Sequence, residues 1–401
     1  MRDYFTFLRY NWPLLGFGFS CIFWGNLGQS FFVSWYGASI QGALNLSAAA
    51  YGSLYSGGTL ASALTIIALG GLIDRWPLAR FTIAVAGGLT AACILMLISN
   101  HAFVLLGAFY LLRLCGQGLL PHTAQTTMAR YFDADRGKAL SVSASAVPIG
   151  EVVLPLLAVA LISSIGWRGS WFVFALSIPL LYLPISLWLL RRSPQLQHDL
   201  PPQSAHTKAK AKGRRDMLGD YRFWLALPTV LAPPFLLTAI FIQQGFILQE
   251  KNWDPIWLAS CFIVFGAMHW LASLLAGVLI DQFSARKLLP FILAPLILAL
   301  LSLAYLDGYW VAPLFMGLLG VTIGTSSPVN GALWAEVYGT TKLGSIRSLM
   351  TALMVLSTAA SPILFGAIID MGASAQTLFS VSALCVLAAA GLVMLSYPRQ
   401  P

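Results

Sequence analysis

The second half of this 401-residue chain repeats the first half at a constant displacement of 207 residues. The repeat is visible at residues that interrupt or end helices: Asp74 and Asp281, Pro121 and Pro328, Tyr131 and Tyr338, Gly137 and Gly344, and Pro155 and Pro362. One displacement at five separate places indicates a duplicated structural unit. The chain therefore has two equivalent halves, and a fold for one half predicts the fold of the other.

The composition excludes a water-soluble fold, since 58% of the residues are apolar and only 9% are charged, against about 25% charged residues in soluble domains. About 20 apolar residues cross one bilayer. On that length we expect spans near 12–36, 48–72, 80–99, 102–126, 139–163, 168–190, 222–248, 255–280, 288–306, 309–333, 345–369 and 375–396.

These spans predict an all-α membrane protein with 12 transmembrane helices in two pseudo-symmetric six-helix bundles. The bundles occupy residues 1–190 and 221–401, and a hydrophilic linker at 191–220 joins them. Parallel repeats of apolar helices are typical of secondary transporters, whose substrate site lies between the repeats near the bilayer midplane.

The basic residues predict the orientation, because cytoplasmic loops hold an excess of Lys and Arg. If both termini are cytoplasmic, 20 of the 23 basic residues lie on that side. We therefore expect a multi-pass protein of the cell membrane, in a bacterium the inner membrane, with both termini in the cytoplasm. The net charge of +9 then reflects topology and not nucleic-acid binding. The basic run in the linker either anchors this topology or attracts anionic lipid head groups.

The sequence shows no signature of an enzyme, a metal or a cofactor. All five cysteines fall inside expected spans without ligand spacing, so we expect them to be buried and to form neither disulfides nor metal sites. A phosphate-binding loop is absent, which argues against an ATP-driven pump, and no cleaved signal peptide is expected. The expected partners are the lipid bilayer and a small-molecule substrate, and we expect a monomer. A receptor or assembly factor built on a transporter-like fold remains an alternative.

The loop between the second and third spans, Gly-Leu-Ile-Asp-Arg-Trp-Pro-Leu-Ala-Arg at 71–80, resembles the signature loop of the major facilitator superfamily. A weaker copy lies at 277–287, and Arg113 with Gly116 and Gly118 is similar to the pattern of that superfamily's fourth span. The segment Arg-Gly-Lys-Ala at 136–139, followed by Gly-Trp-Arg at 166–168, resembles the monocarboxylate and oxalate/formate branch. The first-span lysine and the eighth-span Asp/Arg pair of that branch have no counterpart here.

The resemblance implies that the signature loop is a latch that closes the cytoplasmic gate. Its candidate residues are Asp74, Arg75 and Arg80, with Asp281 in the second copy. Arg130, at the inner end of the fourth span, is the nearest candidate partner for Asp74. The alternative is that these are ordinary loop charges that fix topology.

Two charged residues, Arg113 and Glu151, fall near helix centres, where an ionised side chain costs about 2.5–3.5 kcal/mol. Counted at about 1.5 Å per residue, both reach the same depth on neighbouring antiparallel spans, so a pair is expected. At the duplicated positions stand Gly320 and Thr358, so a half-bundle does not need these charges to fold. The pair either neutralises itself for burial or is displaced by a substrate or a proton.

Further polar candidates are a histidine in the eighth span and amides on spans one, seven and ten, which together with span four are the spans that the resemblance implies line the cavity. His269 replaces Ser62 at the duplicated position and is either a proton carrier or a hydrogen-bonded packing residue. The amides either contact substrate or join helices; they are Asn26, Gln29, Gln243, Gln244 and Asn330.

These residues together predict a secondary active transporter of a small organic solute. An anion is favoured because Arg113 can bind a carboxylate in a bidentate manner, and Glu151 or His269 would couple transport to protons. The alternative is a multidrug-type exporter that exchanges protons for amphipathic cations bound at Glu151.

Overall fold

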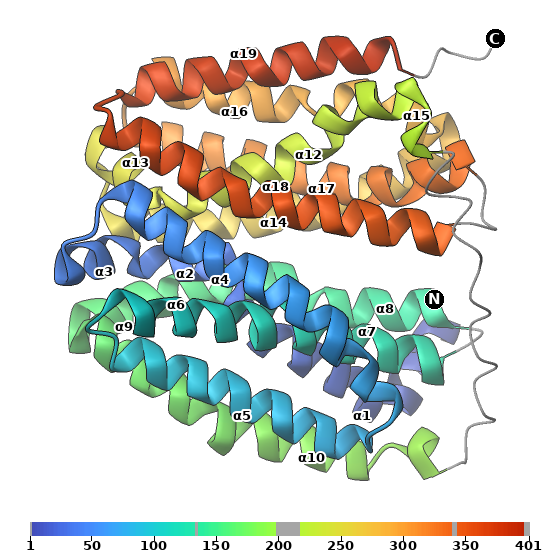
Figure 1. Ribbon diagram of the computed structural model, residues 1–401. Coiled ribbons are helices and arrows are strands. Elements are labelled where there is room, and N and C mark those ends of the chain that lie inside the picture. Colours follow the sequence, from blue (N-terminus) through green and yellow to red (C-terminus); the bar gives the residue numbers. More distant parts are fainter. Residues whose placement is uncertain (1, 133–134, 198–216, 339–342, 397–401) are drawn as a thin grey trace. The chain divides into compact units, whose positions relative to one another are not determined.

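A computed structural model of the protein describes residues 2–132, 135–197, 217–338 and 343–396, and every regular element in these ranges is helical. The chain divides into two compact units (Figure 1). Unit 1 comprises Met1–Leu46 and Ser53–Gln203, and unit 2 comprises Ser47–Gly52 and Ser204–Pro401. Most of the linker expected at 191–220 lies outside the described residues, so its role as a linker stays a prediction.

Unit 1 consists of long apolar helices that are interrupted by short 3₁₀ and π segments. Its principal elements are α1 (Arg2–Gly25), η1 (Asn26–Gly28), α2 (Ser30–Val33), η2 (Ser34–Tyr36), α3 (Gly37–Leu44), α4 (Ala48–Leu69), η3 (Gly70–Asp74), α5 (Leu78–Leu97), α6 (Ala102–Leu111), η4 (Leu112–Leu119), α7 (Leu120–Tyr131), α8 (Arg136–Ala144), α9 (Ala146–Ser177), η5 (Ile178–Tyr182), α10 (Leu183–Arg191) and η6 (Pro194–Gln197).

Unit 2 has fewer interruptions among its described residues. Its elements are α12 (Tyr221–Ile242), α13 (Gln244–Lys251), α14 (Pro255–Phe283), α15 (Ala285–Leu288), η7 (Leu289–Phe291), α16 (Ala294–Tyr305), α17 (Val311–Tyr338), α18 (Leu343–Asp370) and α19 (Ala375–Met394).

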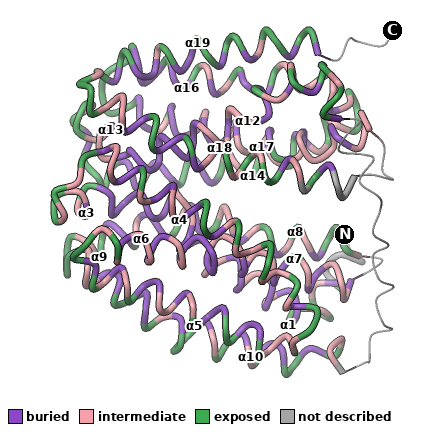
Figure 2. The backbone as a smooth tube through the Cα atoms, viewed as in Figure 1, coloured by how far each residue is buried: buried purple, intermediate pink, exposed green. Residues whose placement is uncertain are grey.

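Many helices carry exposed large apolar side chains, and Figure 2 marks exposed residues at intervals along α5 and α19. Ile67 and Phe103, for example, are 82% and 87% exposed. In water such surfaces would drive aggregation, whereas in a bilayer they face hydrocarbon and the helical backbone satisfies its own hydrogen bonds. The surface therefore has the character of a membrane protein.

Ten helical segments of the described chain are long and apolar enough to span a bilayer. One of them, Arg136–Arg191, has 56 residues, which is enough for two crossings, and Gly166 at φ 74° breaks it. With this division and with the 24-residue α1, the helices agree with the expected set of twelve. The first helix begins at Arg2, ten residues before the expected start of the span at residue 12.

The duplication reappears in the backbone at the helix ends. Asn45 and Asn252, which lie 207 residues apart, both adopt a left-handed conformation with φ 51° and end α3 and α13. Two residues later in each half, a side chain accepts a hydrogen bond from the next helix, from Ala50 N to Ser47 Oγ and from Ile256 N to Asp254 Oδ1. Asn tolerates this φ better than most residues. Both helices therefore end in the same way, at an asparagine with left-handed backbone geometry.

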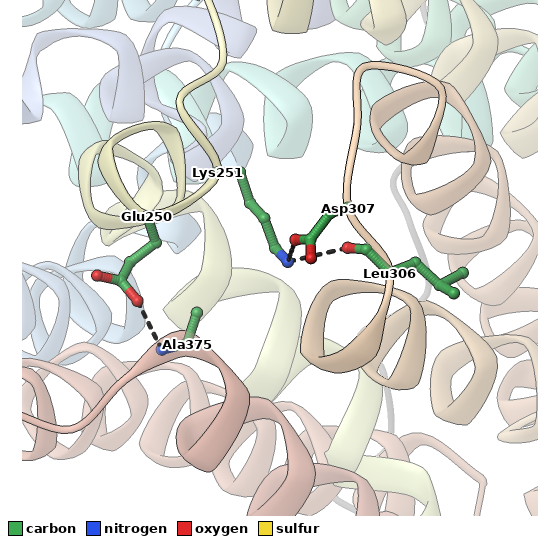
Figure 3. Close-up of polar contacts among 5 residues, drawn as sticks. All are labelled: Glu250, Lys251, Leu306, Asp307 and Ala375. Atoms are coloured by element: carbon green, nitrogen blue, oxygen red, sulfur yellow. Dashed lines mark hydrogen bonds and ion pairs between the residues drawn. The ribbon is translucent and has the colours of Figure 1, made fainter.

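The end of α13 holds two other parts of unit 2 (Figure 3). Lys251 Nζ donates to Asp307 Oδ1 at 2.8 Å and to the Leu306 carbonyl at 2.9 Å, which fixes the loop between α16 and α17. The neighbouring Glu250 accepts a hydrogen bond of 3.0 Å from Ala375 N at the first turn of α19. A carboxylate at a helix N-terminus satisfies a free N–H group and the helix dipole, so α13 anchors α19 at this end.

Candidate functional site

Two helices of unit 1 lose regular α geometry where they cross. The 3₁₀ segment η1 lies opposite the π segment η4, and the crossing is made by glycines. A Cβ atom at Gly28 would lie within 3.0 Å of the Leu112 carbonyl and of Gly116, and one at Gly116 within 3.0 Å of Gly28. The two backbones therefore touch directly. π segments inside helices are rare and occur often at functional sites.

Arg113 projects from this π segment and is only 6% exposed. Its guanidinium carbon lies 5.1 Å from the centroid of the Tyr55 ring of α4, a cation–π arrangement. Its Nε is buried without a hydrogen-bond partner among the described residues. The tertiary structure thus places a buried cation against an aromatic face.

The expected ion pair between Arg113 and Glu151 is not formed. The ion pairs of the described residues join Arg130 to Asp74, Lys138 to Asp135 and Lys251 to Asp307. Counting depth along the helices assumed regular α geometry, and the π segment that carries Arg113 departs from it. Equal depth therefore did not imply that the two side chains meet.

Glu151 nevertheless lies close to η1, the 3₁₀ segment that follows α1. It is 5% exposed on α9, and its neighbour Gly150 packs so closely on Asn26 that a Cβ there would lie within 3.0 Å of the Asn26 amide. Asn26 Nδ2 donates to the Ala146 carbonyl of α9 at 3.0 Å. Segment η1 thus touches both the π segment that carries Arg113 and the turn of α9 that carries Glu151.

The two amides of this region, Asn26 and Gln29, differ in how far they are buried. Asn26 is 1% exposed, and its Oδ1 has no hydrogen-bond partner in the described part of the chain. Gln29 is half-buried and has extended backbone geometry, φ −79° and ψ 150°, where α2 begins. Asn26 therefore joins helices with its NH₂ group, while its oxygen remains available for a ligand.

The signature loop of unit 1 forms the pair that the sequence predicts. Arg130 of α7 donates to the Asp74 carboxylate, the Asp74 side chain being 58% and the Arg130 side chain 20% exposed. His122, also on α7, contacts the Gly70 carbonyl at 3.1 Å, and Arg80 lies 4.8 Å from the Trp76 ring centroid. Arg75 is exposed. The Asp74–Arg130 pairing is confirmed, and the gating role of the loop stays a prediction.

The corresponding loop of unit 2 is organised by a different acid. Asp281 is exposed near the end of α14. Glu336 of α17 is only partly exposed and accepts hydrogen bonds from Ala285 N at 2.8 Å and Arg286 N at 3.2 Å. The Arg286 guanidinium donates to the Glu336 carbonyl. This carboxylate therefore caps the chain where α15 begins.

The two loops therefore have opposite charge arrangements. In unit 1 the fourth span supplies the cation Arg130 and the loop supplies the anion, whereas in unit 2 the tenth span supplies the anion Glu336. The residue equivalent to Glu336 in the first half is Ala129, directly beside Arg130. A charged residue at the inner end of each of these spans was the signal in the sequence.

The amides of unit 2 have mixed roles. Gln243 is 3% exposed, and its Nε2 donates to the Ala48 carbonyl at 3.0 Å and to the Pro362 carbonyl at 3.3 Å. Gln244 is equally buried. Asn330 of α17 is half-buried, and its Oδ1 lacks a hydrogen-bond partner among the described residues. The NH₂ group of Gln243 is therefore committed to the backbone, and Asn330 keeps a free acceptor.

His269 lies where α14 and α17 approach most closely. A Cβ atom at Gly324 would lie within 3.0 Å of the His269 carbonyl, and one at Gly320 would crowd the Phe265 carbonyl. The His269 ring is half-buried, with its centroid 6.1 Å from that of Phe265. The position that carries Arg113 in the first half thus carries a glycine that permits helix contact in the second.

The comparisons with known proteins agree with this architecture. Residues 15–268 match the family profile of the Major Facilitator Superfamily. The crystal structure of the nucleoside transporter NupG has a TM-score of 0.76 at 14% identity and covers 97% of this chain and 100% of that chain.

A second solved structure is a bacterial homologue of the human lysosomal transporter Spinster in an inward-facing and occupied conformation. Its TM-score is 0.70 at 15% identity, with 96% of this chain and 97% of that chain covered. No curated protein matches the chain. At these identities the likeness concerns the fold and not the substrate.

Proposed function

Since the chain belongs to the major facilitator superfamily, a family of transporters and not of enzymes, we propose that it carries a small organic anion across the membrane together with protons. The observation that supports an anionic substrate is Arg113, a buried guanidinium beside Tyr55 with no ion pair to an acid among the described residues. The resemblance to the monocarboxylate and oxalate/formate branch points to the same class of substrate.

The energetic cost of burying the Arg113 cation favours an anionic ligand. A charge near the centre of a membrane helix costs about 2.5–3.5 kcal/mol even on the most favourable scale. The Tyr55 ring recovers about 2 kcal/mol, the magnitude for a desolvated cation–π contact, but supplies no counter-charge. A substrate carboxylate would supply the remaining counter-charge and would accept two parallel hydrogen bonds from the planar guanidinium.

Proton coupling is assigned to Glu151 because η1 joins it to the Arg113 region. Neutralising Arg113 with an anion removes positive potential from a low-dielectric site that also contains Glu151. In this mechanism the anion on Arg113 and a proton on Glu151 move together. By linkage, a proton on Glu151 favours the anion to the same degree.

The second candidate is an exporter that exchanges protons for an amphipathic cation. It is favoured by the burial of Glu151, which is 5% exposed on α9. In that mechanism Glu151 binds the cation, and the bound cation displaces a proton. The sign of the proton movement therefore separates the two candidates.

The test is a thermal-unfolding screen of the purified protein against carboxylates, sugars, nucleosides and hydrophobic cations. A ligand at 100 times its Kd stabilises the folded state by about 2.7 kcal/mol. We expect a carboxylate to raise the Tm of the wild type but not of Arg113→Gln. The matched control is Arg168→Gln, since Arg168 donates to the Ser99 carbonyl at 2.9 Å, away from the π segment. Stabilisation by cations alone would contradict the anion proposal.

A further inference from the structure

Unit 2 contains an apolar groove that no transport residue named above lines. It encloses about 430 Å³ between α12, α18 and α19. Its floor includes Leu236, Phe365, Leu378 and Val386, each at most 5% exposed. Figure 1 shows α12 between α18 and α19. The groove is a persistent gap between three helices and not a cleft at a loop.

The rim of the groove is exposed and apolar. Leu364 on α18 and Val381 on α19 are 51% and 53% exposed, and Cys385 also lines the groove on its exposed side. The expectation that all five cysteines are buried was therefore wrong for Cys385, because the medium that covers this face is hydrocarbon. All three helices are candidate membrane spans, so the groove opens where lipid tails are the solvent.

The dimensions match one leaflet of the bilayer. On α19 the lining runs from Thr377 to Ala389, which is about 18 Å at 1.5 Å per residue. On α18 it runs from Ser357 to Ile368, a similar length. Half of the hydrocarbon core is about 15 Å thick. The groove therefore begins near the α18–α19 loop and ends near the middle of the membrane.

The groove offers an occupant few unpaired polar atoms with which to form hydrogen bonds. Ser382 Oγ donates to the Leu378 carbonyl at 2.8 Å within its own helix. Thr377 lies at the end of the groove beside the α18–α19 loop. A polar substrate would lose its hydration without finding partners here, whereas a hydrocarbon chain loses nothing. The lining thus favours a saturated or unsaturated acyl chain.

Contacts at both ends keep the groove from collapsing. Near the membrane centre, Thr229 Oγ1 of α12 donates to the Ala389 carbonyl of α19 at 2.9 Å. At the loop end, Glu250 holds the first turn of α19 through Ala375 N (Figure 3). These two contacts fix the backbone of α19 at both ends of the groove.

We propose that this groove binds one acyl chain of a bilayer lipid, inserted from the leaflet on the side of the α18–α19 loop. The chain completes the packing between α12, α18 and α19 and so becomes part of the folded unit. This site is separate from the Arg113 region and does not depend on the transported substrate.

The test uses a phosphatidylcholine that carries a photoreactive diazirine near the middle of one acyl chain, in vesicles containing the full-length protein. After illumination, mass spectrometry locates the cross-links. We expect saturable labelling of the α12 wall at Leu231, Ala232 and Phe235, which excess unlabelled phosphatidylcholine suppresses. Uniform labelling of all exposed apolar faces would overturn the proposal.

A matched pair of variants tests the groove itself. Cys385→Trp places an indole in the groove, while Leu384→Trp adds the same side chain at the adjacent residue, which is 65% exposed and outside the lining. Labelling of the α12 wall should fall to the level of the other exposed faces in the first variant only. Ala232→Phe, from the opposite wall, repeats the test if Cys385→Trp fails to fold. Unchanged labelling in a folded filling variant, or displacement of the label by a small hydrophobic cation but not by lipid, would refute the assignment.

Discussion

The Arg113 guanidinium lies 5.1 Å from the centroid of the Tyr55 ring, and no ion pair links it to an acid within the described residues. This relationship gives the cation a neighbour that attracts it without neutralising it. The Nε edge of the guanidinium fork has no hydrogen-bond partner among the described residues. The first prediction concerns that fork.

Replacing Arg113 with lysine keeps the charge and removes the planar pair of donors. Losing one charge-assisted hydrogen bond costs about 1.5–3 kcal/mol, so we expect carboxylate affinity to fall by about 10- to 150-fold, measured by titration calorimetry. Arg168→Lys is the control and should bind like the wild type. Equal affinities for Arg113→Lys and the wild type would exclude Arg113 as the anion ligand.

The second prediction concerns proton coupling. In proteoliposomes, Glu151→Gln should abolish accumulation driven by a pH gradient and preserve counterflow between equal substrate pools, because counterflow needs no net proton movement. Proton uptake with substrate in the wild type indicates anion co-transport, and proton release indicates cation exchange. Full pH-driven accumulation in Glu151→Gln would remove this residue from the mechanism and leave His269 as the candidate.

The third prediction concerns the contact between η1 and α9. Gly150→Ala inserts a methyl group within 3.0 Å of the Asn26 amide, and overpacking of this kind costs about 1–3 kcal/mol. We expect a lower Tm and slower transport, measured on the same preparation. Gly87→Ala is the matched helical control, since a Cβ there meets nothing within 4 Å. A wild-type Tm and rate in Gly150→Ala would show that this contact is not needed.

The fourth prediction concerns the loops that contain Asp74 and Asp281. Asp74→Asn should change the ratio of labelling at the two membrane faces by loosening the contact with Arg130, while ligand affinity stays nearly unchanged. A double-mutant cycle of Asp74→Asn and Arg130→Gln should give a coupling of about 0.2–1 kcal/mol, the range for exposed pairs.

Asp281→Asn, in the second copy of the loop, should have little effect because Asp281 is exposed. Glu336→Gln should have the larger effect in that half, since Glu336 accepts hydrogen bonds from two backbone N–H groups. The latch hypothesis fails if Asp74→Asn leaves the labelling ratio at its wild-type value.

Several features followed from local sequence because they depend on one helix or one turn. The apolar segments and the 207-residue repeat are of this kind. The Asp74–Arg130 pair was also predictable, since both residues lie at the C-terminal ends of the second and fourth spans, which end on the same side of the membrane. In each case a short range of chain determines the geometry.

Other features required the packed structure. The π segment at Leu112–Leu119 turns Arg113 toward Tyr55 and away from an ion pair with Glu151, and no periodicity in the sequence marks it. Glu336 replaces Asp281 as the organising acid because it reaches the start of α15 from another helix. Cys385 faces outward because α19 meets α12 and leaves a groove beside α18.

Sequence alone thus determined that the chain crosses a membrane as two repeated helical bundles, because continuous segments of about 20 apolar residues span a bilayer as helices, whose backbone hydrogen bonds are satisfied within the segment. Tertiary structure alone decided which buried polar groups meet, because the rotation of each helix about its axis and its local breaks are set by contacts with neighbours. A side chain's depth can be counted along a helix, whereas its direction depends on the helices packed around it.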